Sequence, residues 1–99
     1  MLPLRWTERA ITDLEGIAEF VSRTSAVYAE GVVLRIDQRL QLLREYPQLG
    51  KLAPEGDDLR VREVVVDSYR VFYRPQDTCV EVLTILHGRQ HTPHEFQTA

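Results

Sequence analysis

The feature that most constrains the fold is a change of hydrophobic periodicity in the middle of the chain. Before residue 47, apolar residues recur every three or four positions, which is typical of amphipathic helices. After residue 58, apolar residues fall in short runs rich in Val and Tyr, separated by turn-forming residues, which is typical of strands. The sequence therefore predicts helices followed by a sheet, an α+β domain.

Two helices are predicted, over residues 8–22 and 26–46. Thr7 and Ser25 immediately precede them and are suited to accept hydrogen bonds from the first free backbone N–H groups. Pro47 ends the second helix. The buried face of the first helix is predicted to contain Ile11, Leu14, Ile17, Ala18 and Val21. The buried face of the second is predicted to contain Ala29, Val33, Ile36, Leu40 and Leu43. The short link between the helices predicts an antiparallel helical hairpin.

Four strands are predicted around this hairpin. A short N-terminal strand covers Leu2 to Trp6, and Pro3 suits a strand start or a sheet edge. Residues 47–58 form a loop, after which 59–66, 69–74 and 80–87 read as three consecutive antiparallel strands. The order is β-α-α-β-β-β, and the helical hairpin is expected to cover one face of an antiparallel sheet, with Trp6 and Phe20 in the core.

A length of 99 residues predicts a single domain, 1–99, in which residues 88–99 are polar and form an irregular, flexible tail. The formal net charge of −3 gives no support to a dedicated nucleic-acid binder, which usually carries a basic surface. Cys79 is the only cysteine, so no intrachain disulfide can form, as is common in a reducing compartment. Without a signal peptide or a long apolar run, a soluble cytoplasmic protein is expected, with no membrane contact.

Three segments carry a family resemblance. They are Tyr46-Pro47-Gln48-Leu49-Gly50 after the second helix, Tyr69-Arg70-Val71-Phe72-Tyr73-Arg74 in a strand, and Ile85-Leu86-His87-Gly88-Arg89 at the end of the last strand. In this order and spacing they resemble the RelE/ParE toxin superfamily along nearly the whole chain. The resemblance implies a toxin of a type II toxin–antitoxin system, neutralised by a co-produced antitoxin that wraps the folded domain. RelE-like members cut messenger RNA on the ribosome, whereas ParE-like members poison DNA gyrase and show no nuclease activity.

Two positions near the C-terminus favour the ParE-like activity. Cutting RNA requires groups that move protons and cations that stabilise the phosphorane. RelE-like members place an arginine after the last strand and a tyrosine near the C-terminus, where this chain has Gln90 and Phe96. Lys51 is also the only lysine. The resemblance therefore predicts a gyrase inhibitor that is not an enzyme, with a ParD-like antitoxin as partner in a hetero-oligomer.

Two alternatives stay open. One is a ribosome-dependent endoribonuclease acting on mRNA, in which Arg62 and Arg70 supply cations and His87 moves protons. The other is a domain that keeps the fold and antitoxin binding but has lost toxicity.

The candidate partner-binding residues are basic or apolar. The basic ones are Arg60, Arg62, Arg70, Arg74 and Arg89, which either form a docking patch or pair with Glu63, Asp67 and Glu81 on a solvated surface. The apolar ones are Tyr28, Val32, Leu34 and Leu42, which lie off the predicted buried face and either pack on the sheet or remain for a partner. His87, His91 and His94 lack an array of supporting ligands, so no metal or cofactor is expected.

Overall fold

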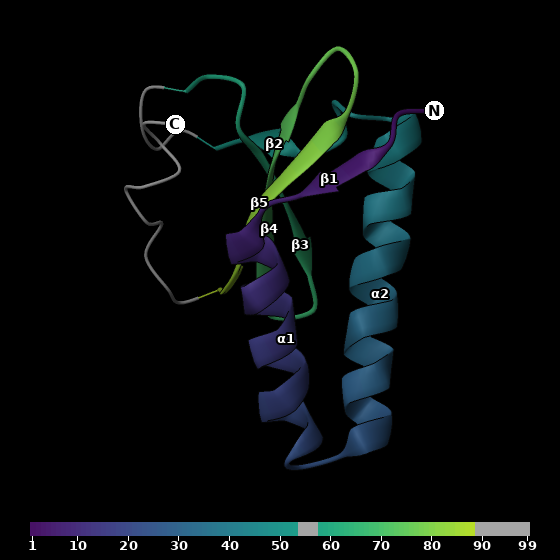
Figure 1. Ribbon diagram of the computed structural model, residues 1–99, viewed down its shortest axis with the longest axis vertical. Coiled ribbons are helices and arrows are strands. Elements are labelled where there is room, and N and C mark those ends of the chain that lie inside the picture. The colour runs from purple at the N-terminus through teal and green to yellow at the C-terminus, as the bar shows by residue number, and fades with distance from the viewer. Residues whose placement is uncertain (54–57, 89–99) are drawn as a thin grey trace.

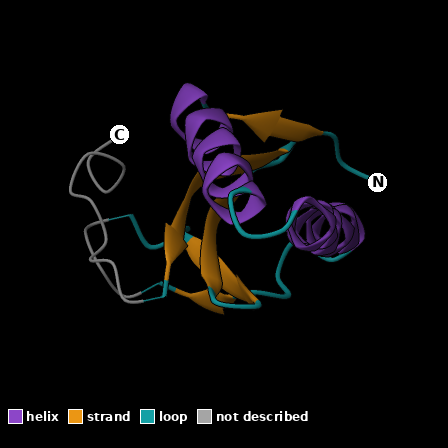
Figure 2. Ribbon diagram, turned by 90° about the horizontal axis from the view of Figure 1, so that it is seen from below, coloured by secondary structure: helices purple, strands orange, loops and turns teal. Residues whose placement is uncertain are grey.

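The computed structural model describes residues 1–53 and 58–88 of the chain (Figure 1). Its elements, in chain order, are β1 (Leu4–Trp6), α1 (Glu8–Ser22), α2 (Ala26–Glu45), β2 (Lys51–Leu52), β3 (Arg62–Val66), β4 (Tyr69–Pro75) and β5 (Val80–His87). The two helices are joined by a short turn and lie on one side of the sheet (Figure 2). The predicted α+β class and the order of helices and strands are confirmed. Among the described residues, no helix has the length and apolar character needed to span a membrane.

The sheet is mixed, not purely antiparallel as predicted. Its strand order is β1-β5-β4-β3-β2, and β1 runs parallel to β5 at one edge. The amide of Val80 donates to the carbonyl of Pro3 at 2.9 Å, so the proline lies at the edge position that its missing N–H permits. The three predicted C-terminal strands are consecutive and antiparallel, as expected. A register shift between β4 and β5 lies at Phe72 and Tyr73.

Both predicted helix caps are present. The Thr7 hydroxyl accepts from the Ala10 amide at 3.1 Å and donates to the Leu83 carbonyl at 2.8 Å, which fixes the start of α1 over β5. The Ser25 hydroxyl accepts from the Tyr28 amide at 3.1 Å. These side chains satisfy donors that have no partner within the helix. The helical hairpin therefore begins where the sequence predicts, and α2 ends before Pro47.

The buried face of α2 differs from the prediction at one position. Ala29, Ile36, Leu40 and Leu43 are buried as expected, but Val32 is also buried, at 1% exposure, whereas Val33 is only half-buried. Neighbouring helical positions are about 100° apart, so both valines fit the same periodic pattern and packing decides between them. In α1, Leu14 and Ile17 pack against the core, but Ile11 remains 45% exposed.

A second apolar cluster lies on the sheet face opposite the helices. It consists of Ala53, Val61, Phe72, Leu83 and Leu86. The prediction that Phe20 is a core residue is wrong, since its side chain is 69% exposed near the end of α1. Trp6 is half-buried and packs against the core, close to expectation. The aromatic ring of Phe20 thus belongs to the surface, not to the interior.

The segment between α2 and β3 also departs from the prediction. Lys51 and Leu52 form a two-residue edge strand inside the predicted loop. β3 begins at Arg62 because the Asp58 carboxylate accepts from the Arg60 amide at 2.9 Å, which favours a turn over an extended chain. Gly88 is the last described residue, so the remainder of the predicted tail, 89–99, lies outside the described part of the chain.

Candidate functional site

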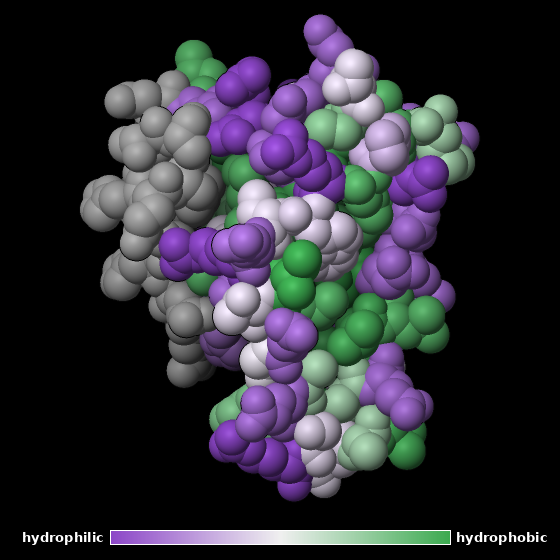
Figure 3. Space-filling model, viewed as in Figure 1, coloured by the Kyte–Doolittle hydropathy of each residue, from purple (hydrophilic) through white to green (hydrophobic). Residues whose placement is uncertain are grey.

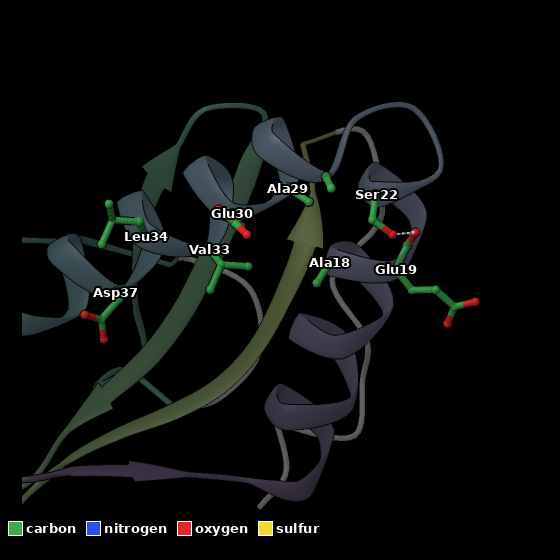
Figure 4. Close-up of a pocket in the computed structure, with 9 residues that line it drawn as sticks. Ala18, Glu19, Ser22, Ala29, Glu30, Val33, Leu34 and Asp37 are labelled. Carbon is green, nitrogen blue, oxygen red and sulfur yellow. Dashed lines mark hydrogen bonds between the residues drawn. The ribbon is translucent and has the colours of Figure 1, made fainter.

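An apolar groove lies between the second half of α1 and the first half of α2. It has a volume of about 710 Å³ and is visible as apolar surface between the helices (Figure 3). Its walls come from small or branched side chains: Ala18 faces Val33 across the groove, and Ala26, Ala29 and Leu34 extend the wall of α2 (Figure 4). The small side chains explain the groove, because alanines at facing positions leave the space that larger residues would fill.

The rim of this groove is acidic. Glu19, Glu30 and Asp37 line it together with Ser22, whose hydroxyl donates to the Glu19 carbonyl at 2.7 Å (Figure 4). Glu19 forms an exposed ion pair with Arg23, at 3.2 Å. An apolar floor with a carboxylate rim matches an amphipathic segment that carries apolar side chains flanked by cations.

The four predicted apolar partner residues do not form one surface. Tyr28, Leu34 and Leu42 are exposed by 53%, 55% and 41%, as expected for residues available to a partner. Leu34 lines the groove between the helices, whereas Leu42 borders a different groove beside β3. Val32 is a correction: its side chain belongs to the core and is closed to a partner.

The predicted basic patch is paired internally. Arg74, whose side chain is 7% exposed, contacts the carboxylates of Asp58 at 2.7 Å and Glu81 at 2.8 Å. Arg70 contacts Glu63 at 2.8 Å and lies 4.8 Å from the ring centre of Phe72. The acid-paired alternative therefore describes Arg70 and Arg74, with Glu63 and Glu81 as the predicted partners.

The other acids and arginines are arranged differently. Asp67 pairs with Arg35, not with an arginine of the sheet. Arg60 is exposed and contacts Asp58 at 3.3 Å. Burial disfavours the charged form of Asp58, but hydrogen bonds from Arg60 and the charge of Arg74 outweigh it and hold the pKa of this carboxyl below its ordinary value. Arg89 lies outside the described residues.

The three residues of the alternative nuclease site do not converge. Arg70 and His87 border one hollow of about 670 Å³, together with Val65, Asp67, Ser68 and Gly88. Arg62 lies opposite Tyr73 in the sheet, and His87 lies opposite Tyr69. Four residues along a strand correspond to roughly 13 Å. Arg62, at the start of β3, thus lies too far from His87 along the strand direction to act on a phosphate held between Arg70 and His87.

Arg62 instead stabilises the turn that follows α2. Its guanidinium donates to the carbonyls of Gly50 at 2.7 Å and Gln48 at 3.3 Å. The His87 ring meets the Tyr69 ring edge-on, with centroids 5.8 Å apart. Within residues 1–53 and 58–88, no three potential metal-binding side chains lie together; His91 and His94, like Gln90 and Phe96, fall outside these residues.

Comparison with known proteins places the chain in a family. Residues 4–92 match the family described as the ParE toxin of type II toxin–antitoxin system, parDE. The chain belongs to this toxin family. The superfamily resemblance carried by the Pro-x-x-Gly, strand and His-Gly-Arg segments is thereby confirmed.

Two curated relatives and one solved structure extend this result. The chain is 34% identical to Toxin RelE2 of Caulobacter vibrioides over 89 residues, which cover 89% of this chain and 97% of that protein. It is also 34% identical to Y4kP of Sinorhizobium fredii over 92 residues, covering 91% and 92% of the two chains. A structure of the chromosomal ParDE TA system from P. aeruginosa superimposes with a TM-score of 0.71 at 22% identity, over 88% of this chain and 96% of that one. That structural likeness supports the fold.

The Pro-x-x-Gly segment of this ParE-family chain has a structural explanation that sequence reasoning missed. The Tyr73 hydroxyl donates to the Pro47 carbonyl at 2.8 Å and accepts from the Gly50 amide at 2.8 Å. Burial raises the pKa of Tyr73, although the Gly50 hydrogen bond and the charge of Arg62 oppose this effect. The signal was present in the sequence: a tyrosine amid apolar strand residues needs a polar partner, and a turn after a helix has free amides and carbonyls.

A second missed residue is Asp13. Its carboxylate accepts from the Thr84 hydroxyl and, at 3.0 Å, from the Ile85 amide. These bonds join the middle of α1 to β5, close to the register shift between β4 and β5. An acid on a half-buried helical face was the available signal, but its partners are 71 and 72 residues away in the sequence.

Proposed function

We propose that this protein is a toxin that binds and inhibits DNA gyrase, catalyses no reaction of its own, and is held inactive by an antitoxin produced with it. Membership of the ParE family supports a toxin of this type. The observation that carries the choice of mechanism is the arrangement of the arginines. Arg62 and Arg70 are engaged by the protein's own carbonyl and carboxylate oxygens, and they lie at different ends of the sheet.

This arrangement is poorly suited to cutting RNA. Stabilising a phosphorane requires cations aimed at one point, and a single such donor contributes about 10²–10³-fold to the rate. Glu63 neutralises Arg70, and the hollow that Arg70 shares with His87 also contains Asp67. Gln90 and Phe96 further remove a charge and a proton donor from the positions where RelE-like members have them. A protein that inhibits by binding needs none of these groups.

A ribosome-dependent endoribonuclease remains the second candidate. It is favoured by the single hollow bordered by both Arg70 and His87. In this mechanism His87 would move a proton and Arg70 would face the scissile phosphate. The similarity to a protein named RelE2 is also consistent with this candidate.

One protein stock separates the two mechanisms when supercoiling by gyrase and cleavage of ribosome-bound messenger are assayed side by side. We expect inhibited supercoiling or gyrase trapped on cleaved DNA, with intact messenger. The nuclease mechanism is tested with His87→Ala, and Arg23→Ala, at an exposed position in the turn between the helices, serves as its matched control. Codon-phased cuts that disappear in His87→Ala, with unaffected gyrase, would establish the nuclease instead. Inactivity in both assays, with antitoxin binding retained, would identify a non-toxic remnant.

The antitoxin is proposed to place an amphipathic segment in the groove between the helices. The support is the apolar wall of Ala18, Val33 and Leu34 beneath an acidic rim. Leu34→Glu should weaken binding strongly, because it buries a carboxylate beside Glu30 and Asp37. Val27→Glu is the control, since Val27 is also exposed on α2 but does not line the groove. Equal loss of binding in both variants would mean that the groove is not the antitoxin site.

A further inference from the structure

The outer edge of β3 is open over its second half. β2 covers only the first two residues of β3, pairing Lys51 with Glu63 and Leu52 with Arg62. Residues 64–66 continue past the end of β2 and pair only with β4. In Figure 1, β3 lies between β4 and α2, and its far end turns into β4 beside the middle of α2.

The backbone of Val65 points toward this open edge. Val66 and Tyr69 flank a two-residue turn, so they form a hydrogen-bonded pair, and the bonding alternates along the hairpin. The N–H and C=O groups of Val65 therefore point away from β4. A second hydrogen bond agrees with this alternation. The Ala53 amide donates to the carbonyl of Val61 at 2.9 Å, and Val61 lies four residues before Val65, so the backbone groups of both residues point to the same side.

A groove of about 380 Å³ runs along this edge, between β3 and α2. Val66 and Leu42 form its apolar part, and Leu42 is 41% exposed. Val65, 55% exposed, presents its side chain on the opposite face of the sheet. An added strand would therefore find apolar contacts on both of its faces, in the groove and at Val65, and its side chains would alternate between them.

The polar wall of the groove is basic. The side chains of Gln38 and Arg39 are exposed on α2 and form no hydrogen bond or ion pair with another described residue. Arg35 is held by Asp67, with contacts of 2.8 and 2.9 Å that close the end of the groove at the turn. Arg39 is consequently the cation available to an incoming carboxylate.

We propose that an extended segment of the antitoxin, carrying a carboxylate next to apolar side chains, adds to the sheet at Val65 and lies in the groove between β3 and α2. This inference rests on the proposed function, since it assumes that an antitoxin binds. The backbone of the segment would exchange hydrogen bonds with the Val65 N–H and C=O groups, and its carboxylate would meet Arg39.

A second copy of the chain does not fit the same edge. Symmetric antiparallel pairing centred on Val65 would place Asp67 of one copy opposite Glu63 of the other. Lys51 of β2 already occupies that position beside Glu63. The open edge therefore accepts a segment that approaches from the turn, not the equivalent strand of another molecule.

The test uses the wild-type toxin with the small protein encoded beside it, purified as a complex. Amide hydrogen exchange should show that the Val65 amide exchanges rapidly in the free toxin and at least tenfold more slowly in the complex. The amides of residues 76–79, in the turn between β4 and β5, should not change. Rapid exchange of the Val65 amide in a tight complex would overturn the proposal while leaving the proposed function intact. Absence of any complex would instead remove this proposal together with the antitoxin part of the proposed function.

Two pairs of variants test the same proposal independently, through the dissociation constant of the complex. Val65→Pro removes the outward-pointing N–H without breaking a hydrogen bond to β4, and an edge position tolerates proline, so the dissociation constant should rise about tenfold. Val65→Thr keeps the N–H and should bind within about twofold of wild type. Arg39→Glu should also weaken binding about tenfold, whereas Arg5→Glu, at an exposed position of β1 at the opposite edge of the sheet, should not. If Val65→Pro fails to fold, the exchange rate and the Arg39 pair still decide; unchanged binding by Arg39→Glu together with unprotected Val65 would refute the proposal.

Discussion

The side-chain hydroxyl of Tyr73 accepts a hydrogen bond from the backbone amide of Gly50, 2.8 Å away and 23 residues earlier in the chain. The same hydroxyl donates to the Pro47 carbonyl. One buried side chain in the centre of the sheet thus holds the turn after α2 at both of its ends. The Pro-x-x-Gly segment that marks the family is, in this protein, the docking site of a tyrosine.

The close approach of Tyr73 requires glycine at position 50. A Cβ atom there would lie 2.6 Å from the Tyr73 hydroxyl and 2.7 Å from the backbone oxygen of Glu63. Gly50→Ala should therefore lower the free energy of unfolding by about 1–3 kcal/mol, as overpacking does. Gly16→Ala is the matched control, because a Cβ at this helical position meets nothing within 4 Å, and it should stabilise by about 0.5–1 kcal/mol. Urea denaturation that ranks the two variants in the opposite order would contradict this explanation.

The hydroxyl itself can be tested by Tyr73→Phe. This change keeps the ring in the core but leaves the Gly50 amide and the Pro47 carbonyl without their shared partner. Leaving buried polar groups unsatisfied costs about 1–3 kcal/mol, so we expect a loss of that size in chemical denaturation. Tyr46→Phe is a suitable control, because Tyr46 is 55% exposed. Equal stability of the two variants would show that water replaces the hydroxyl without cost.

Local signals in the sequence predicted most of the fold. Thr7 and Ser25 were recognisable caps because each lies directly before a periodic apolar run, and both hydroxyls accept the expected amide. The start of β3 at Arg62, and not at residue 59 as predicted, also has a local cause in the hydrogen bond from the Arg60 amide to Asp58. The parallel pairing of β1 with β5 was not predictable in the same way. It joins residues about 76 positions apart, and three residues of strand carry no local signal of direction.

The candidate site depended more on tertiary contacts. The prediction that Glu63 and Glu81 pair with arginines of the sheet is confirmed, because these acids lie in strands next to β4. Asp67 pairs with Arg35 of α2, 32 residues earlier in the chain, a contact between a helix and the turn after β3 that local sequence does not indicate. The apolar periodicity also could not predict that Val32 is buried in place of Val33, since a small rotation of the helix changes which valine faces the core without changing the sequence pattern.

Leu40 provides a test of the helical seam. Its side chain is completely buried in the core cluster, so Leu40→Ala should lower the free energy of unfolding by about 2–5 kcal/mol. Leu34→Ala removes the same atoms from a side chain that is 55% exposed, and its effect should be within about 0.5 kcal/mol. A loss below about 0.5 kcal/mol for Leu40→Ala would mean that α2 does not face the sheet in this way.

Acid should weaken the contact between Asp58 and Arg74. The folded protein holds the pKa of Asp58 below its ordinary value, so the folded state binds fewer protons on this group than the unfolded chain. The resulting stabilisation is present above the unfolded pKa of about 3.9 and is lost as pH falls through the lower folded value. Asp58→Asn should cost about 1.5–3 kcal/mol at pH 7, and the difference from wild type should shrink below about pH 4. A difference that is constant from pH 7 to pH 2 would show that the charge of Asp58 does not contribute; Asp77→Asn, at an exposed position, controls for general acid effects.

Binding of the antitoxin should be accompanied by a large negative change in heat capacity. The groove between the helices and the groove beside β3 both expose apolar side chains, including Leu34 and Leu42, that a folding segment would cover. Burial of apolar surface lowers the heat capacity, and coupled folding of a segment increases the buried area to about 1,000–3,000 Å². Titration calorimetry at several temperatures measures this quantity, and the dissociation constant should be nanomolar or lower because a toxin must be held inactive. The variant Leu34→Glu should reduce both the affinity and the heat-capacity change, whereas Val27→Glu should alter neither. A heat-capacity change near zero in the wild-type titration would instead indicate a small polar interface, and the two apolar grooves would then have no part in neutralisation.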